Sequence, residues 1–538
     1  MRRAVLRSPK GAVVFRMVRR RVGTIVAVSA IALVLAACAG GGGGTAPSAG
    51  SGGDGTPQAG GTAIVGSLTE MPGFDPVRLV AAGTGIERAA QVMDTLMYRD
   101  DVTDEVTPKL AKSLESDDGR VWVLTLRDGV DFTDGTPLDA AAVVFNLERH
   151  IAPDSTSPAK SVLSGIEKLE ATGELEVTIT LREPSGSFPL ALTGSSSASL
   201  IGSPKALADP DAFNSSPVGA GPFVFKSWVR DSELKLVRND DYWDKGKPYL
   251  DALTFRVLVD SQSRADAVIA GGVTLAQVTG TSWAAVEANP SLVTVRSSTG
   301  GQALVPNASR APADDERVRQ AIGLATDPKV ANTIIFPGSD LWDENRDCIP
   351  FPEGAAACLE GASPTPDMDE AKKLIADYVA DGGDPTIDFM VLASTDEYAY
   401  YQRQMTETGL DVKLRVVDYA GFLEESAAGN YGVLGGVNAS AGYPTHWRYL
   451  YSGGRNWGGV VNEDLDEALI RARDELQLDD RNAAWRDVAE ITKRDSVLFW
   501  TAPYSNATSY SKKLHLGTED FPFQGGLMVY FGDAWMEQ

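Results

Sequence analysis

Two short runs of residues with alternating side-chain faces constrain the fold more than any other feature of this 538-residue chain. The runs span 223–228 and 234–237, and the polar residues 230–232 separate them. A period of two on either side of a short polar turn predicts a β-hairpin. In such a hairpin Phe225 and Trp228 would lie on opposite faces. A single hairpin could equally be a generic surface feature. The rest of the sequence is therefore needed to identify the fold to which it belongs.

The remaining sequence predicts mixed α/β structure. Residues 121–126 alternate as a strand, and apolar residues from Ala140 to Ile151 recur at helical spacing. Further along, the predicted elements are helix 369–379, strand 386–392, helix 398–407, strand 412–417 and helix 420–428. Regular alternation of helices and strands is typical of βα winding.

Five blocks of the sequence resemble, in the same order, successive segments of one protein family. They are WVLTLRDGVDFTDGTPLDAAAVVFNLER (122–149), PVGAGPFVFKSW with RNDDYWDKGKPYLD (217–228 and 238–251), VIAGGVTLA (268–276), DDERVRQAIGLATD (314–327) and ETGLDVKLRVVDYAGF (407–422). The family is that of the family 5 extracytoplasmic solute-binding proteins of ABC transporters, of the peptide-binding and oligopeptide-binding lipoprotein type. The resemblance runs from about residue 61 to the C-terminus and is loosest between residues 336 and 401.

This resemblance implies a fold and a mode of action. The implied fold is α/β, of the periplasmic-binding-protein type II kind, with two lobes joined by a hinge and an extra subdomain on the first lobe. Lobe I would comprise residues 61–302 and 505–538, the extra subdomain about 92–215, and lobe II 303–504. A ligand that contacts both lobes stabilises the closed form, which a membrane permease then recognises.

The N-terminus predicts export and lipid attachment. Basic residues 19–21 precede an apolar run at 22–35, and the sequence Leu-Ala-Ala-Cys ends it at Cys38. This is the pattern of a bacterial lipoprotein signal peptide, residues 1–37, whose removal would leave Cys38 as the lipidated residue. The apolar run is shorter than the roughly 20 residues that a transmembrane helix needs. We therefore expect a lipid-anchored protein on the extracytoplasmic face of the cell membrane.

Residues 38–60 have the composition of a flexible tether. They are mostly Gly, Ser, Ala, Thr and Pro, with too little apolar surface to fold. Without the signal peptide, 41 of the 49 basic residues remain against 73 acidic ones, so the exported body carries a net charge of about −32. Such a charge argues against nucleic acid as a partner. With 43% hydrophobic residues, the chain can build the cores of at least two domains. We expect the protein to be a monomer.

Only two cysteines remain in the exported body, Cys348 and Cys358, on either side of a turn-rich loop. In an oxidising compartment we expect them to form a disulfide, worth roughly 3 kcal/mol in the chain-entropy model. A redox or metal site is the alternative. However, Cys-x9-Cys matches no common zinc spacing, and no histidine lies nearby.

The resemblance also indicates where a ligand would bind. Relatives that bind peptides with a free amino terminus carry an aspartate a few residues before a proline, here Pro444, and Ser440 occupies that position. No Asp or Glu lies between Tyr431 and Trp447, so a buried ammonium would lack its charge partner. The arginine with which dipeptide-binding relatives hold the ligand carboxylate is also absent between 388 and 401. Both departures weaken a simple dipeptide-binding hypothesis.

The predicted ligand-binding residues are neutral or aromatic: Asn438, Ser440, Tyr443, Trp447, Trp283 and Tyr98. The first two offer hydrogen-bonding groups, and the aromatic side chains offer flat apolar surfaces. Such a lining suits neutral, stackable or amide-rich ligands. The alternative for the aromatic residues, Trp447 above all, is that they pack in the core of a lobe.

Other function classes find less support. The histidines His150, His446 and His515 are not paired at ligand spacing, so we predict no metal and no cofactor. The sequence has no Gly-x-Ser-x-Gly elbow, His-Glu-x-x-His motif, phosphate loop or dinucleotide fingerprint, so we expect no enzyme. A surface lipoprotein that acts as a sensor or adhesin on the same fold remains an alternative. The favoured hypothesis is the solute-binding lipoprotein of an importer, which captures a peptide-like or other small organic solute.

Overall fold

The computed structural model describes residues 56–79, 84–100, 103–335, 348–351, 355–359, 361–440, 449–454, 456–517, 523–524 and 528–538. All of them belong to one unit of the chain, Ala49–Gln538. The predicted lipidation site Cys38 and the predicted ligand contacts Tyr443 and Trp447 lie outside the described residues.

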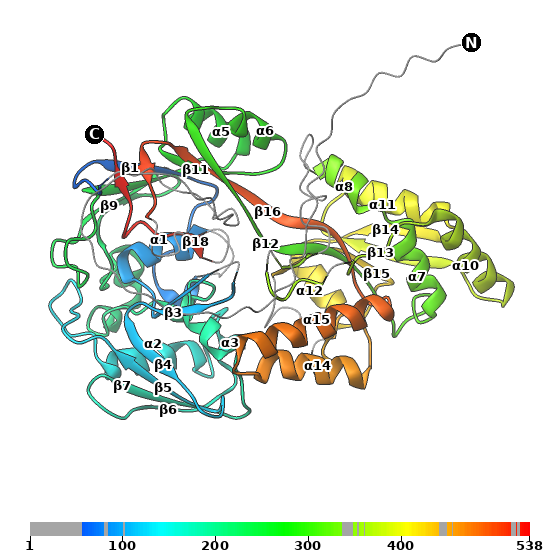
Figure 1. Cartoon of the computed structure of the whole chain (residues 1–538), viewed down its shortest axis with the longest axis horizontal. Helices are drawn as coiled ribbons and strands as arrows, with labels where there is room; N and C mark the ends of the chain where they lie inside the picture. The colour runs from blue at the N-terminus through cyan, green and yellow to red at the C-terminus, as the bar shows by residue number, and fades with distance from the viewer. Residues whose placement is uncertain are drawn as a thin grey trace, which may run out of the picture. The chain divides into compact units, whose positions relative to one another are not determined.

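A ten-stranded mixed sheet forms the frame of this unit (Figure 1). Two long strands, β12 (Leu292–Pro306) and β16 (Phe499–Ser511), pair antiparallel at its centre. On one side follow β15 (Val433–Ser440), β13 (Thr386–Val391) and β14 (Asp411–Val416), and on the other β11 (Leu275–Val278), β1 (Thr62–Ser67), β10 (Ala252–Val257), β9 (Glu233–Arg238) and β8 (Phe223–Val229). Because β12 and β16 pair from Leu292 to Leu304, they run through both halves of the sheet.

Smaller sheets and helices surround this frame. An antiparallel sheet has the order β4 (Ala111–Glu115), β5 (Val121–Leu126), β7 (Glu176–Leu181), β6 (Ile166–Ala171), and two-stranded pairs join β2 (Met97–Arg99) to β3 (Val106–Pro108), β17 (Leu514–His515) to β20 (Trp535–Met536), and β18 (Phe523–Gln524) to β19 (Met528–Val529). The helices are α1 (Thr84–Met93), α2 (Ala140–Ile151), α3 (Lys160–Leu163), α4 (Pro210–Ser215), α5 (Ser261–Ile269), α6 (Trp283–Glu287), α7 (Glu316–Ala325), α8 (Pro328–Ile335), α10 (Met368–Ala380), α11 (Asp396–Glu407), α12 (Tyr419–Ala427), α14 (Glu463–Asp474) and α15 (Leu478–Arg494).

Side-chain caps determine where many of these helices begin. Asp139, Asp260 and Asp367 each accept a hydrogen bond from the backbone N–H three residues further on, at the start of α2, α5 and α10. Asn462 caps α14 in the same way. A cap of this kind stabilises a helix by about 1 kcal/mol, because it satisfies an N–H that has no partner inside the helix.

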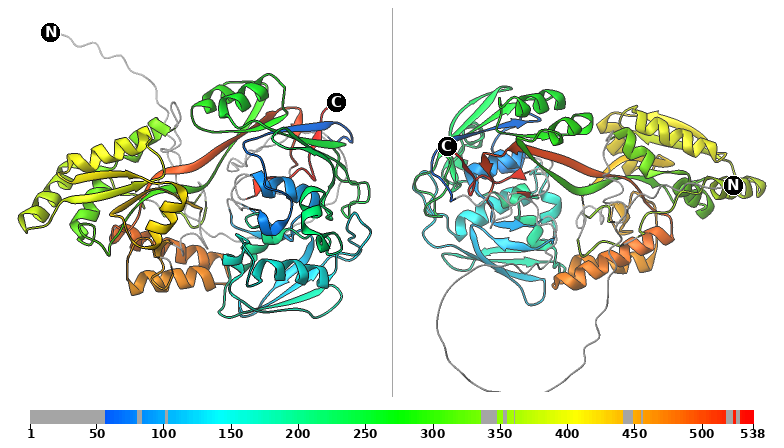
Figure 2. Two further views of the ribbon diagram at one scale, coloured as in Figure 1. Left: turned by 180° about the vertical axis from the view of Figure 1, so that it is seen from behind. Right: turned by 45° about the horizontal axis from the view of Figure 1, so that its top comes forward.

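The half of the sheet that holds β13 and β15 is covered by helices on both faces (Figure 2). One apolar cluster contains Val305 and Leu434 of the strands and Trp485 of α15, together with residues of α12 and α14. A separate cluster contains Leu304 and Val433, the neighbours of the first pair in the strands, and residues of α7, α10 and α11. Alternate residues of these strands are therefore buried on opposite sides, as expected for strands that are covered on both faces.

The predicted hairpin is confirmed, with one error in its pattern of faces. β8 and β9 pair antiparallel across the turn at 230–232. A register shift between Phe225 and Ser227 interrupts the period of two. As a result Trp228 packs on the same side as Phe225, and the centroids of both rings lie close to that of Phe74, at 5.4 and 6.0 Å. The prediction of opposite faces was wrong because a bulge adds a residue without changing the hydrophobic pattern around it.

The predicted alternation of helices and strands in the second half of the chain is confirmed. The elements α10, β13, α11, β14 and α12 begin and end within two residues of the predicted limits. β13 pairs parallel with both β14 and β15, which is the arrangement that βα winding produces.

Candidate functional site

The predicted ligand-binding segment begins at the end of β15, beside the central strands. Asn438 pairs with Gln302 of β12, and Ser440 pairs with Gly300. Since β15 is parallel to β13, the carboxyl ends of both strands lie at one edge of the sheet, where α/β proteins bind ligands. The backbone register therefore places Asn438 and Ser440 where a ligand site is expected, and ligand contact by their side chains stays a prediction.

Trp283 lies in an apolar contact between two helices. Its side chain is 3% exposed and packs with Ala507 of β16 and with Ile335, the last residue of α8. The guanidinium of Arg296 lies 5.5 Å from the ring centroid. Trp283 thus connects α6, which precedes β12 in the chain, with α8, which follows it. Trp283 therefore packs in the core, which was the alternative to ligand binding for the aromatic residues. Its role in ligand binding stays a prediction.

Tyr98 belongs to a buried group of aromatic rings around a lysine. Its ring lies edge-on to that of Tyr530, with centroids 5.3 Å apart, and the ammonium of Lys109 lies 4.8 Å from the Tyr98 centroid and 4.4 Å from that of Tyr530. Trp243 is a third neighbour of this ammonium, at 5.3 Å. Burial raises the pKa of Tyr98 well above its usual value. The flat surface of Tyr98 is therefore already in contact with residues of the same chain.

Asp94 supplies the negative charge of this group. It is fully buried and accepts hydrogen bonds from the Tyr242 hydroxyl at 2.6 Å and from the Trp243 indole at 3.3 Å. Burial raises the pKa of the Asp94 carboxyl, and the charge of Lys109 opposes that rise. No pattern in the sequence connects these residues, which come from four separate segments.

Sequence reasoning missed a buried acid at the carboxyl edge of β13. Glu397 lies in the first turn of α11, is 8% exposed, and forms no hydrogen bond or ion pair with another described residue. Removal from water raises the pKa of its carboxyl to about 7. The signal was present in the sequence, because Glu397, Tyr401 and Met405 follow each other at the spacing of one helix face, which places an acid at a core position.

The residue after Glu397 reaches across to β15. A Cβ on Gly436 would lie 2.2 Å from the hydroxyl oxygen of Tyr398, and the φ of Gly436 is +74°. Both the close approach and the backbone conformation require glycine here. The first turn of α11 therefore packs directly on β15, two residues before Asn438.

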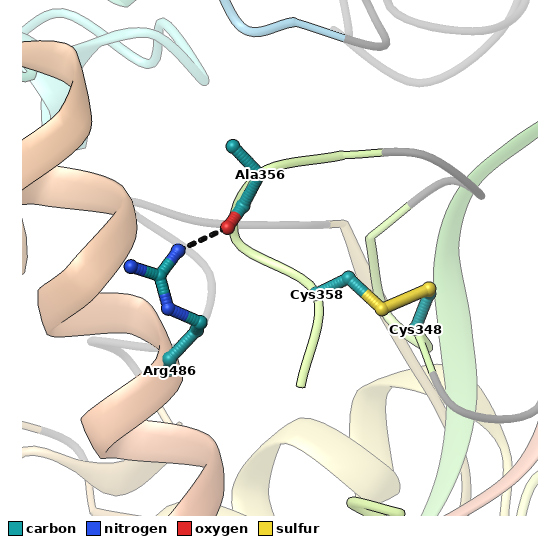
Figure 3. Close-up of a disulfide and its surroundings, with 4 residues drawn as sticks. All are labelled: Cys348, Ala356, Cys358 and Arg486. Atoms are coloured by element: carbon teal, nitrogen blue, oxygen red, sulfur yellow. Dashed lines mark hydrogen bonds between the residues drawn. A yellow bond between two sulfur atoms is a disulfide. The ribbon is translucent and has the colours of Figure 1, made fainter. Parts of the chain in front are cut away.

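The disulfide predicted from the sequence is present between Cys348 and Cys358 (Figure 3). Arg486 of α15 donates a hydrogen bond to the carbonyl of Ala356 within the closed loop (Figure 3). Ile349 is buried in the same apolar cluster as the α15 residues. These contacts fit the structural role that we expected rather than a redox site.

The model of the bacterial extracellular solute-binding proteins, family 5 Middle, matches residues 105–459. The chain belongs to this family. The resemblance to the family 5 solute-binding proteins that five sequence blocks indicated is thereby confirmed.

Two curated relatives show the extent of the similarity. The oligopeptide-binding protein AppA of Bacillus subtilis is 25% identical over 503 residues, which cover 86% of this chain and 89% of AppA. The glutathione-binding protein GsiB of Salmonella paratyphi A is 33% identical over 226 residues, which cover 41% of this chain and 44% of GsiB.

A solved structure supports the fold of this family 5 protein. The ABC transporter substrate-binding protein CtaP of Listeria monocytogenes superposes with a TM-score of 0.72 at 20% identity, covering 89% of this chain and all of CtaP. The predicted fold class, an α/β fold of the periplasmic-binding-protein type II kind, is confirmed. Among the described residues, no helix has the length and apolar character needed to cross a membrane.

Proposed function

We propose that this protein is the solute receptor of an ABC importer, which binds a peptide-like or other small organic solute and delivers it to a membrane permease. Membership of the solute-binding family over residues 105–459 carries the proposal. Similarity to CtaP, an ABC transporter substrate-binding protein, and to relatives named for oligopeptide and glutathione binding supports it. The protein then acts by binding and release, without catalysing a reaction.

The proposed binding mode is closure of two lobes around the solute. Lobe I comprises 61–302 and 505–538, with the extra subdomain at about 92–215, and lobe II comprises 303–504. β12 and β16 run from one lobe into the other, which is the topology of a hinge. A solute that contacts both lobes stabilises the closed form by its difference in affinity for the two states, and the permease recognises that form.

The proposed ligand has no free ammonium at the position of Ser440. The segment from Tyr431 to Trp447 contains no acid, and an unpaired buried ammonium there would cost several kcal/mol. Neutral hydrogen-bonding groups at Asn438 and Ser440 with aromatic surfaces at Tyr443 and Trp447 suit a blocked or larger peptide, an oligosaccharide or another neutral group at this position.

The proposed location is the extracytoplasmic face of the cell membrane. Removal of residues 1–37 would leave Cys38 to carry two acyl chains, and two chains make a stable anchor whereas one is marginal. Expression of Cys38→Ala tests this point, because the variant is expected to lose its lipid and to leave the membrane fraction. A variant that stays lipidated and membrane-bound would contradict it.

Identification of the bound solute tests the function itself. The mature body is purified without denaturation from its native host, and mass spectrometry identifies the small molecules that it releases on unfolding. We expect a stoichiometric small solute that rebinds in calorimetry and whose affinity falls in Asn438→Ala. Release of no solute, together with no heat of binding for peptides or oligosaccharides, would contradict the proposal.

A further inference from the structure

Two hydrogen-bond acceptors near the end of β15 lack a partner among the described residues. One is the carboxyl of Glu397 in α11, a residue that is 8% exposed, and the other is the buried side-chain carbonyl oxygen of Gln302 in β12. Polar groups that are removed from water without a partner destabilise the folded protein, carboxylates most of all. Native proteins contain few of them, so two in one part of the sheet call for an explanation.

Further polar groups lie where α11 packs on β12. Tyr401 follows Glu397 by one helical turn, is completely buried, and has a pKa that burial and the Glu397 charge both raise. Its hydroxyl oxygen has no hydrogen-bond partner among the described residues. The Thr501 hydroxyl of β16 donates to the backbone carbonyl of Gln302 at 3.1 Å. Because Tyr401 shares an apolar cluster with Leu304, two residues after Gln302, we group Glu397, Tyr401 and Gln302 as one polar cluster at the interface of α11 and β12.

This cluster adjoins the predicted ligand-binding segment. Gln302 is the direct β-sheet partner of Asn438, and Tyr398, next to Glu397, packs on Gly436 of the same strand. Among the described residues, no lysine, arginine or histidine forms an ion pair with Glu397. The cluster therefore presents two unpaired acceptors, one of them a carboxyl, and no described cation of the protein pairs with that carboxyl.

We propose that Glu397 and Gln302 form a subsite for a cationic, hydrogen-bond-donating group of the ligand, an ammonium or a guanidinium. This inference rests on the proposed function and names the ligand chemistry at a position distinct from Ser440. The cation compensates the buried carboxylate and donates to both acceptors, which removes the cost of leaving them unpaired. A ligand that is neutral beside Ser440 and cationic beside Glu397 satisfies both positions.

The test compares peptide probes that differ in one cation. Calorimetry at pH 8 measures binding of trialanine, of its N-acetylated amide, and of the blocked peptides N-acetyl-Ala-Lys-Ala-amide and N-acetyl-Ala-Arg-Ala-amide. The proteins are the wild type, Glu397→Gln, which keeps the shape without the charge, and Glu407→Gln. Glu407 is an exposed acid at the other end of α11 that pairs with Lys372, so it serves as a matched control.

We expect at least one cationic probe to bind more tightly than the fully blocked neutral peptide. Glu397→Gln should weaken that probe by at least about tenfold, the usual consequence of removing one partner of a buried charge pair, and Glu407→Gln should leave it unchanged. The melting temperature of free Glu397→Gln should equal or exceed that of the wild type, because the variant no longer buries an unpaired carboxyl.

The outcomes separate this inference from the proposed function. Binding of neutral probes or of a co-purified neutral solute, without preference for a cation, would overturn the subsite and leave the solute receptor standing. Cationic probes that bind Glu397→Gln as well as the wild type would do the same. Failure of every probe to bind, with no solute released from the native protein, would overturn both.

Discussion

The backbone amide of Ser187 donates a hydrogen bond to the carbonyl oxygen of Arg473 at 3.0 Å. Beside it the amide of Gly186 donates to the carbonyl of Asp474 at 3.2 Å, and the Gly186 carbonyl accepts from the guanidinium of Arg481 at 3.1 Å. These bonds join the loop after β7, in the proposed extra subdomain, to the end of α14 and to the first turn of α15 in the proposed lobe II. They stabilise the arrangement in which these two parts touch, and separation of the lobes has to break them.

Gly186→Ala should disrupt this contact. A Cβ at this position would lie 1.9 Å from the carbonyl oxygen of Glu475, and backbone cannot move aside as a flexible side chain can. We expect the free energy of unfolding to fall by about 1–3 kcal/mol and the amide of Ser187 to exchange hydrogen faster. Urea denaturation and hydrogen exchange measure the two effects. Gly165→Ala is the control, because a Cβ there has no atom within 4 Å, and unchanged behaviour of Gly186→Ala would refute the prediction.

Arg149→Leu should be among the most destabilising single substitutions in the first half of the chain. Asp75 is 1% exposed and accepts two hydrogen bonds from the Arg149 guanidinium, at 3.0 and 2.9 Å. Removal of the arginine leaves a buried carboxylate without this partner, which costs about 3–5 kcal/mol. Lys413→Met removes an exposed ion pair with Asp411 and should change the unfolding free energy by less than about 1 kcal/mol. Equal effects of the two substitutions in chemical denaturation would contradict this.

Local patterns predicted the elements of this protein well, because they depend on neighbouring residues only. The helix limits of α10 to α12 follow from apolar spacing and from caps such as Asp367 and Asp418. Pairing of β12 with β16 was not predictable in this way, since Leu292 and Ser511 meet across most of the second half of the chain. The resemblance to a known family predicted lobe boundaries near residues 303 and 505, but it predicted no strand pairing there.

The candidate site was harder to predict, because it depends on which polar groups the packing leaves without partners. Tyr98 was chosen for its aromatic surface, but Lys109 and Tyr530 already contact that ring, and they come from distant segments of the chain. Glu397 was overlooked because charged residues in the first turn of a helix are usually exposed and favourable there. Its helical spacing with Tyr401 and Met405 indicates burial, but only the fold shows that no other described residue pairs with its carboxyl.

Removal of the disulfide should destabilise the protein without unfolding it. The bond between Cys348 and Cys358 closes a short loop, and the chain-entropy model assigns about 3 kcal/mol to such a closure. The double substitution to serine should lower the unfolding free energy by about that amount, and reduction of the wild type should have the same effect. Detection of two free thiols in the native, non-reduced protein would show that the bond does not form.

A buried acid in α1 should make the stability of the protein depend on pH. Glu87 is 1% exposed, and its Oε1 accepts a hydrogen bond from the backbone N–H of Val529 at 3.4 Å. Burial raises the pKa of this carboxyl from 4.5 to about 7, although the charge of Arg88 opposes the rise. Between these two values the folded protein binds more protons than the unfolded chain, so the Glu87 contribution to stability falls as pH rises from about 4.5 to 7.

Glu87→Gln should therefore stabilise the protein at pH 8 relative to the wild type and flatten the loss of stability between pH 4.5 and 7. The upper limit of the effect is about 3 kcal/mol, from the size of the pKa shift. Glu397, whose pKa is also about 7, contributes a slope of the same sign, so the double variant should be flatter still. Burial lowers the pKa of His150 to about 4, so its contribution to stability rises with pH up to about 6.5. This opposite slope should dominate the pH dependence that remains in the double variant. Urea denaturation at half-unit pH intervals measures these slopes, and a Glu87→Gln profile parallel to that of the wild type would show that Glu87 is ionised in the folded protein throughout.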